Sequence, residues 1–294
     1  MSKLFWVGVS AVRCFNPFAT NAYPKQFEHL NYVDIMPGVK VRDIEMKIRS
    51  GDDIVISPAA GNSNTQHDRL PTGLELVKAI EVDYPRRICH YKGCTYVGTY
   101  NNAIDRIDKD GSVTKSFIRL DGYPCGIIAH QDRLYVLQKG THSSICVFNL
   151  LGQQLLIWNH SDSESRFFLG RALAIINNDE LVVADRTNKT FNMYSLTGEI
   201  LRSVRCDEIG DGTVSLCHAG VDAIIVTHYG AQHELFKFNL ATGAVEWRSN
   251  AVKHPSAVAM LNKEYALVTE WESGAQVKFS IVNQMTGEVR LNVL

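Results

Sequence analysis

The sequence lacks several features that would point directly to a class of protein. It has no apolar run near the roughly 20 residues that a membrane-spanning helix needs, no CxxC pair and no glycine-rich phosphate loop. It also lacks an excess of either charge: 30 lysines and arginines stand against 31 aspartates and glutamates, for a formal net charge of -1. We therefore expect no nucleotide cofactor, no membrane partner, and no nucleic-acid binding that depends on overall basic charge.

The cysteines argue against a protein held together by disulfides. There are seven, an odd number, and only Cys89 and Cys94 are closely spaced, so we expect reduced and mostly buried thiols. The apolar stretch from Leu4 to Val12 is interrupted by a glycine and a serine, and it fits a strand better than a signal peptide. Together these features predict a cytoplasmic protein.

A turn signal that ends in glycine recurs six times, and a strand-like run follows each copy. Successive glycines are 38 to 46 residues apart. Glycine tolerates the positive φ of a tight hairpin, so each copy predicts the turn between the last two strands of a unit. The six copies are Leu70-Pro-Thr-Gly73, Asp108-Lys-Asp-Gly111, Asn149-Leu-Leu-Gly152, Ser195-Leu-Thr-Gly198, Leu240-Ala-Thr-Gly243 and Gln284-Met-Thr-Gly287.

Two further elements precede each glycine, and together they predict the fold. One is a β-branched or aromatic run that ends in polar residues: 54–57, 96–99, 135–138, 182–185, 225–228 and 267–270. The other is often introduced by proline, as at Pro85, Pro124 and Pro255. Four short strands per unit, without helical periodicity, predict an all-β fold, a six-bladed β-propeller of four-stranded antiparallel blades. A β-sandwich or two barrels would also have many short strands, but neither predicts six copies of one strand order.

The repeats divide most of the chain into consecutive blades. The predicted blades cover about 37–82, 83–120, 121–164, 165–209, 210–250 and 251–294. Residues 1–36 remain as an N-terminal extension, and its strand-like part is a candidate to pair with the last blade, close the ring and protect a sheet edge.

The fourth unit carries a resemblance to a known family. From Gly170 to Tyr194 it has a small-residue start, a strand, a turn, a strand end of Val-Ala-Asp at Asp185, and an asparagine three residues later at Asn188. This pattern resembles the NHL-repeat propellers of tripartite-motif proteins. Other units replace Asp185 with threonine, glutamine, histidine, glutamate or serine, and the Asn-His-Leu triplet is absent. The resemblance implies a propeller, and a chain that would be the substrate- or RNA-recognising end of a ubiquitin-ligase-type protein.

In a propeller of this strand order, the loops before the first strand and after the second strand of each blade lie on one face. Aromatic and cationic residues are frequent in those loops. The predicted ligand-binding residues are Tyr84, Arg86, Arg87, Tyr100, Tyr123, Lys139, Arg166, Phe168, Arg171, Arg186, His228, Tyr229, Lys253, His254 and Trp271.

Aromatic rings interleaved with arginine and lysine anchor peptides, and they also stack on unpaired bases. Acidic neighbours such as Asp83, Asp121 and Glu270 weaken the positive field and favour a protein or peptide partner. The predicted function is thus a non-catalytic recognition or scaffold module, with single-stranded RNA binding as an alternative. Many of these rings could instead pack between blades.

An enzyme is the remaining alternative. The second strands end in Asp185, His228 and Glu270 in the fourth, fifth and sixth units, and these residue types bind divalent metals or transfer protons. Some propellers that look similar are metal-dependent lactonases or lyases. Such sites need several convergent ligands, and polar residues at strand ends often only bond to loops. We therefore predict no catalytic residue and no metal, and name these three residues as the ligands if a metal is bound.

Overall fold

The described part of the chain is entirely β-structure. In the computed structural model it comprises residues 40–50, 71–83, 85–140, 143–159, 172–177, 179–210, 213–228, 234–261, 263–270 and 278–290. These residues form 22 strands and no helix. Among them, accordingly, no helix is long and apolar enough to cross a membrane. The extension over residues 1–36 and the strand expected at 54–57 lie outside the described residues.

Twenty of the strands form five four-stranded antiparallel sheets, each from four consecutive strands. The first sheet contains β3 (Pro85–Tyr91), β4 (Cys94–Thr99), β5 (Ala103–Ile107) and β6 (Val113–Arg119). The second contains β7 (Tyr123–His130), β8 (Arg133–Lys139), β9 (Ser143–Asn149) and β10 (Gln154–Asn159). The third contains β11 (Leu173–Ile176), β12 (Glu180–Asp185), β13 (Thr190–Ser195) and β14 (Ile200–Arg205). The fourth contains β15 (Thr213–His218), β16 (Ala223–His228), β17 (Glu234–Asn239) and β18 (Ala244–Ser249). The last is β19 (Pro255–Met260), β20 (Tyr265–Glu270), β21 (Lys278–Asn283), β22 (Val289–Arg290).

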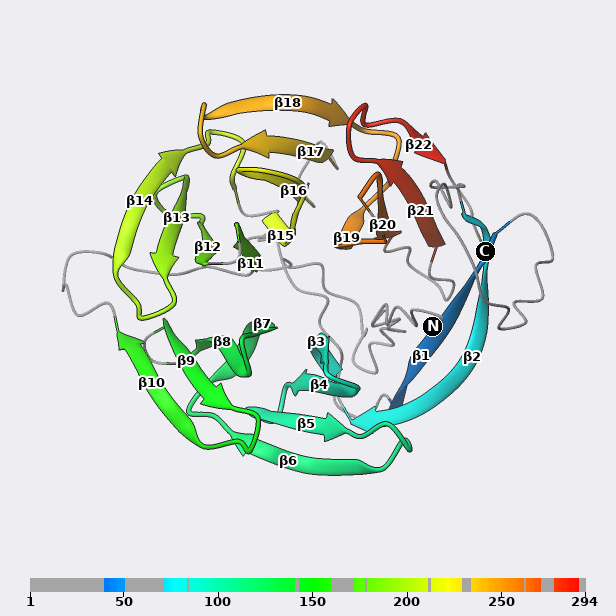
Figure 1. Ribbon diagram of the computed structural model, residues 1–294, viewed down its shortest axis with the longest axis vertical. Coiled ribbons are helices and arrows are strands. Elements are labelled where there is room, and N and C mark those ends of the chain that lie inside the picture. The colour runs from blue at the N-terminus through cyan, green and yellow to red at the C-terminus, as the bar shows by residue number, and fades with distance from the viewer. Residues whose placement is uncertain are drawn as a thin grey trace, which may run out of the picture.

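These sheets are arranged as the blades of a propeller. In Figure 1 the first strand of each sheet lies nearest the centre of the ring and the fourth lies at the rim. Neighbouring first strands are in contact, as between β3 and β7 and between β15 and β19. The predicted all-β propeller of four-stranded antiparallel blades is confirmed.

The described residues form five four-stranded blades instead of the predicted six. In the sixth position of the ring, between the blade β19–β22 and the blade β3–β6, lies the two-stranded sheet of β1 (Lys40–Ser50) and β2 (Pro71–Asp83) (Figure 1). Gly73, expected in a hairpin, lies inside β2 and pairs with Arg49. Leu74, Leu76, Ile80 and Val82 alternate with other residues along β2, with Lys78 as the one polar member of the series, and pairing with β1 continues the strand past this glycine.

The other five repeat glycines lie in the turns between third and fourth strands, as predicted. All have positive φ: Gly111 (87°), Gly152 (83°), Gly198 (99°), Gly243 (70°) and Gly287 (73°). Some also have a second role that the sequence did not indicate. A Cβ added at Gly198 would lie 2.7 Å from the ring of Trp158, and one at Gly287 would lie 2.8 Å from Trp247. Gly198 and Gly287 therefore each leave room for a tryptophan ring from the fourth strand of the preceding blade.

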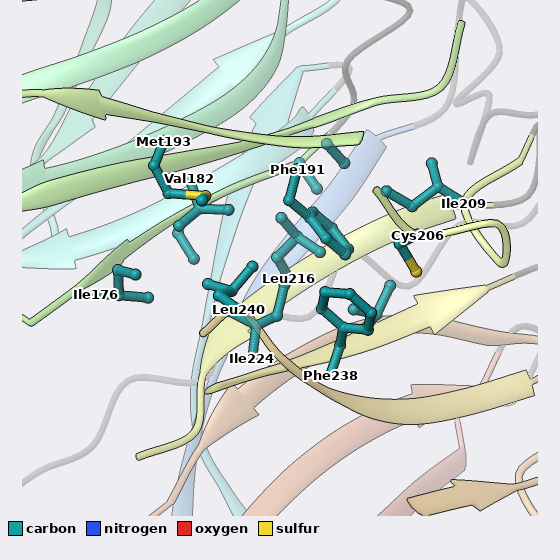
Figure 2. Close-up of a cluster of buried hydrophobic side chains, with 14 of the residues drawn as sticks. Ile176, Val182, Phe191, Met193, Cys206, Ile209, Leu216, Ile224, Phe238 and Leu240 are labelled. Atoms are coloured by element: carbon teal, nitrogen blue, oxygen red, sulfur yellow. The ribbon is translucent and has the colours of Figure 1, made fainter. Parts of the chain in front are cut away.

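The core lies between the blades, and the second and third strands supply most of it. Leu181 and Val183 on β12 pack towards the blade β7–β10, whereas Val182 packs towards the blade β15–β18. Successive side chains of a strand point to opposite faces, so a blade buried on both faces requires an uninterrupted apolar run. Figure 2 shows the cluster between β11–β14 and β15–β18, where the ring centroids of Phe191 and Phe238 are 5.2 Å apart.

Candidate functional site

The strand register places the loops before first strands and after second strands on one face, which we call the top face. Pro85 pairs with Thr99, Tyr123 with Lys139, Thr213 with His228 and Pro255 with Glu270, so each first strand begins where the second strand ends. This arrangement was predicted from the repeat order. The turns between first and second strands form the opposite, bottom face.

The top face contains one preformed group that joins two blades. The guanidinium of Arg86 lies 4.9 Å from the ring centroid of Tyr100 and 4.3 Å from that of Tyr123. Next to it, Arg87 Nε donates to the backbone carbonyl oxygen of Cys125 at 2.5 Å. Arg86 is only 4% exposed, so it supports the two tyrosine rings from between the blades, whereas the sequence indicated an exposed ligand contact. Cation–π contacts become stronger when the cation is desolvated.

Asp185 and Arg186 are buried in the blade β11–β14. The Asp185 carboxylate, 1% exposed, accepts hydrogen bonds from the backbone N–H of Thr187 at 2.9 Å and of Asn188 at 3.2 Å, and from Asn188 Nδ2 at 2.9 Å. Asp185 therefore closes the loop between β12 and β13, a common role for aspartate at a strand end. Arg186 is 7% exposed, which corrects its expected place as a projecting contact.

The carboxylate of Glu270 is also used internally. Its Oε1 accepts a hydrogen bond from Ser280 Oγ at 2.5 Å, and its Oε2 accepts one from the backbone N–H of Lys253 at 3.2 Å. Within the described ranges, no three His, Cys, Asp or Glu side chains form a group that could hold a metal ion. Asp185, His228 and Glu270, which end second strands in three different blades, are thus not among such a group in the described part of the chain.

The remaining predicted contact residues fall into two groups. Arg87, Tyr100, Tyr123, Lys139, His228 and His254 are partly exposed, and Lys253 is exposed. Tyr84, Arg166, Phe168, Arg171, Tyr229 and Trp271 lie outside the described residues. Ligand binding by either group stays a prediction.

An ionic group that the sequence did not indicate lies at the top end of β18. Arg248 Nη1 lies 3.4 Å from Glu234 Oε1, and Nη2 contacts Glu208. Glu208 lies between β14 and β15, and Glu234 begins β17, so the three charges come from separate segments. Since Arg248 belongs to a fourth strand, a search limited to the two loop positions could not have found it.

A buried carboxylate on β5 predicts a pH dependence of stability. Asp105 is 5% exposed, and burial raises the pKa of its carboxyl above the ordinary value of 3.8, although the backbone N–H of Ser116 donates to Oδ1 at 2.7 Å. A folded-state pKa above the unfolded one means that the folded state binds the proton more tightly. Protonated Asp105 therefore favours the folded state, and this contribution to the free energy of unfolding is lost as the pH rises from the pKa of Asp105 in the unfolded chain to its pKa in the folded protein.

We expect Asp105→Asn to raise the free energy of unfolding at pH 7, because it removes a buried charge and keeps an acceptor for Ser116. The gain should shrink as the pH falls toward 3.8, where the native carboxyl becomes protonated. Urea unfolding at a series of pH values measures both effects. The matched control is Asp110→Asn, since exposed Asp110 also accepts a backbone N–H, that of Ser112 at 2.8 Å. Destabilisation by Asp105→Asn at pH 7 would contradict the prediction.

Comparison with solved structures identifies folds similar to this one. A protein of unknown function from Bacteroides caccae aligns with a TM-score of 0.54 and 15% identity over 75% of this chain and 89% of that chain. Virginiamycin B lyase from Staphylococcus aureus aligns with a TM-score of 0.53 and 14% identity over 71% of this chain and 69% of that chain. The Neurospora crassa Pan2 WD40 domain aligns with a TM-score of 0.53 and 10% identity over 70% of this chain and 64% of that chain.

The chain is a β-propeller. Identities of 10–15% show the fold alone, and one of these similar structures is an enzyme, so the propeller fold does not by itself decide between catalysis and binding. No protein-family model and no curated protein matches the sequence. The NHL-type identity expected from the fourth unit is therefore not established by these comparisons.

Proposed function

We propose that this β-propeller is a non-catalytic recognition module that binds a protein or peptide on its top face. The observation that carries this proposal is the group of Tyr100 and Tyr123 around the buried Arg86. Two rings held by a buried cation lose little freedom when a ligand binds, so more of the contact energy remains as affinity. Tyrosine and arginine are also the residues that most often dominate protein interfaces.

Two arginines of the top face are engaged within the protein, which favours a peptide over RNA, while Lys253 is exposed and Arg87 and Lys139 are partly exposed. Arg86 is buried beneath the rings, and Arg248 is paired with Glu208 and Glu234. Non-specific RNA binding relies on exposed cations that follow the phosphate backbone, and it weakens steeply with salt. A partner anchored on aromatic rings does not need such a field.

The internal hydrogen bonds of the strand-end carboxylates support binding over catalysis. Asp185 accepts three hydrogen bonds and Glu270 accepts two, all from neighbouring segments. A general base or metal ligand must instead direct a lone pair at the substrate or ion. These two carboxylates are therefore engaged in holding loops and strands together.

We also propose that the propeller is of the NHL type and acts as the recognition part of a ubiquitin-ligase-type protein in the cytoplasm. The support is the motif of the fourth unit, in which Asp185 and Asn188 bond to each other across the loop at 2.9 Å. This contact gives a structural reason for the aspartate and the asparagine at that spacing.

The test is binding to a displayed library of random peptides. Tyr123 and Lys139 face each other on the top face, and Tyr91 and Lys92 form a similar pair at the bottom, where Lys92 Nζ lies 5.5 Å from the Tyr91 ring centroid. We expect the double variant Y123A/K139E to weaken peptide binding at least about tenfold, as loss of a hot spot does. The matched control Y91A/K92E should bind as the native protein does.

A single-stranded RNA pool at low and moderate salt completes the experiment. Tight RNA binding that weakens steeply with salt and is lost in Y123A/K139E would replace the peptide proposal with RNA recognition. Equal loss of peptide binding in the two double variants would show that the top face is not the site. Thermal unfolding of each variant ensures that only folded protein is compared.

A further inference from the structure

The rim strand β10 differs from the other rim strands in its charge. Each of the others described in a four-stranded blade has at least one charged residue: Lys115 and Arg119 on β6, Arg202 and Arg205 on β14, Glu246 and Arg248 on β18, and Arg290 on β22. The sequence of β10, Gln-Leu-Leu-Ile-Trp-Asn, has none. Charged residues on edge strands normally prevent pairing with other chains, and β10 lacks this protection.

Large apolar side chains are exposed on β10 and on the neighbouring rim strand. Leu155, Leu156 and Ile157 are 45%, 38% and 42% exposed, and Ile200 and Leu201 on β14 are 53% and 49% exposed. Trp158 of β10 packs against Gly198 in the hairpin that precedes β14, so β14 begins close to β10. We call Leu155, Leu156 and Ile157 of β10 the rim patch. Leu156 lies on the face towards β11–β14, with Trp158, and Ile157 lies on the opposite face, so exposed apolar side chains flank this edge strand on both faces. An exposed cluster of this kind marks an interaction surface.

The backbone of β10 adds hydrogen-bonding groups of fixed direction to the rim patch. β10 is the edge strand of its sheet and pairs only with β9 among the described strands. Its outer row of N–H and C=O groups can pair with another strand, which would order the apolar side chains at the same time. The rim patch therefore combines strand pairing with apolar burial, and it lies at the outer edge of the ring, apart from the first strands at the centre (Figure 1).

We propose that two copies of this protein pair their β10 strands in antiparallel fashion and form a two-fold symmetric dimer. Charge selects this partner. Pairing of β10 with β6, β14, β18 or β22 of a second copy would bring a lysine, arginine or glutamate into an apolar contact, which is costly without a partner charge. Pairing of β10 with β10 buries no charge. Antiparallel self-pairing is also isologous, so the assembly closes at two chains.

This dimer goes beyond the proposed function and leaves the top face available. It would present two top faces from one assembly, which raises the avidity for a partner with two binding segments. Dimerisation is measured without any ligand, so its failure would not affect the recognition proposal.

The test is sedimentation equilibrium over a range of concentrations. We expect a mass that rises with concentration from 32.9 kDa to twice that value and no further. Leu156→Arg should weaken association at least about tenfold, because pairing would bring two like charges near the two-fold axis and into an apolar contact. Leu156 and Arg202 each lie four residues after the hairpin glycine of their blade, so the fold accepts arginine at this place. Thr114→Arg on β6 adds the same charge elsewhere on the rim and should leave the dimer intact.

Each remaining outcome would overturn the proposal. Two such outcomes concern the native protein: a monomer at all concentrations, and assemblies that grow beyond two chains. Two concern the variants: a Leu156→Arg variant that dimerises as the native protein does, and a Thr114→Arg variant whose association is weakened as much as that of Leu156→Arg. If Leu156→Arg fails to fold, Leu155→Lys tests the same strand, because Leu155 is the more exposed residue. Circular dichroism shows which variants are folded.

Discussion

Replacing Phe191 with alanine should lower the free energy of unfolding by about 3–5 kcal/mol, the usual cost of removing a buried aromatic side chain. Phe191 is fully buried, and its ring packs against Phe238 with the planes tilted by 47°. The two rings come from β13 and β17, so the pair joins two neighbouring blades. An aromatic pair contributes about 0.5–1.5 kcal/mol beyond its buried area, which places this contact among the most costly to remove.

Urea unfolding followed by circular dichroism and by tryptophan fluorescence measures the effect, and coincident curves show that a single free energy applies. Phe191→Leu is the matched control, because leucine fills part of the space and should cost less than alanine. A loss below about 1 kcal/mol for Phe191→Ala would mean that the neighbouring blades collapse into the cavity or that the contact contributes little.

Replacing Gly198 with alanine should cost about 2–5 kcal/mol, because two penalties add. The backbone has φ of 99°, where an L-residue is strained by about 1–2 kcal/mol. The new Cβ would also lie 2.7 Å from the Trp158 side chain, and such overpacking costs about 1–3 kcal/mol.

Gly220 provides the matched control for this substitution. It has φ of 104°, but an added Cβ would meet no atom within 4 Å, so Gly220→Ala should cost only the backbone strain of about 1–2 kcal/mol. Combining Gly198→Ala with Trp158→Ala should relieve the steric part and reveal a coupling between the two sites. If the two glycine substitutions cost the same, the contact between blades does not restrict Gly198.

The top face shows where sequence reasoning about the candidate site succeeded and where it stopped. The repeat order identified which loops share a face, and Tyr100, Tyr123 and Lys139 lie there. Exposure was not predictable in the same way. Arg86 is buried because its blade and the next both supply a tyrosine ring, and Tyr123 is 37 residues away in sequence. No local pattern records such a contact.

The sequence by itself determined the strands, the hairpin glycines of five blades and the propeller class, because these depend on local properties. Side chains of a strand alternate in direction with a period of two, and glycine tolerates positive φ. Both properties can be recognised from a few consecutive residues. The number of complete blades, the burial of Arg86 and the internal bonds of Asp185 and Glu270 were decided by the tertiary structure. Each of these depends on which segments come together, as when pairing with β1 carries β2 straight through Gly73.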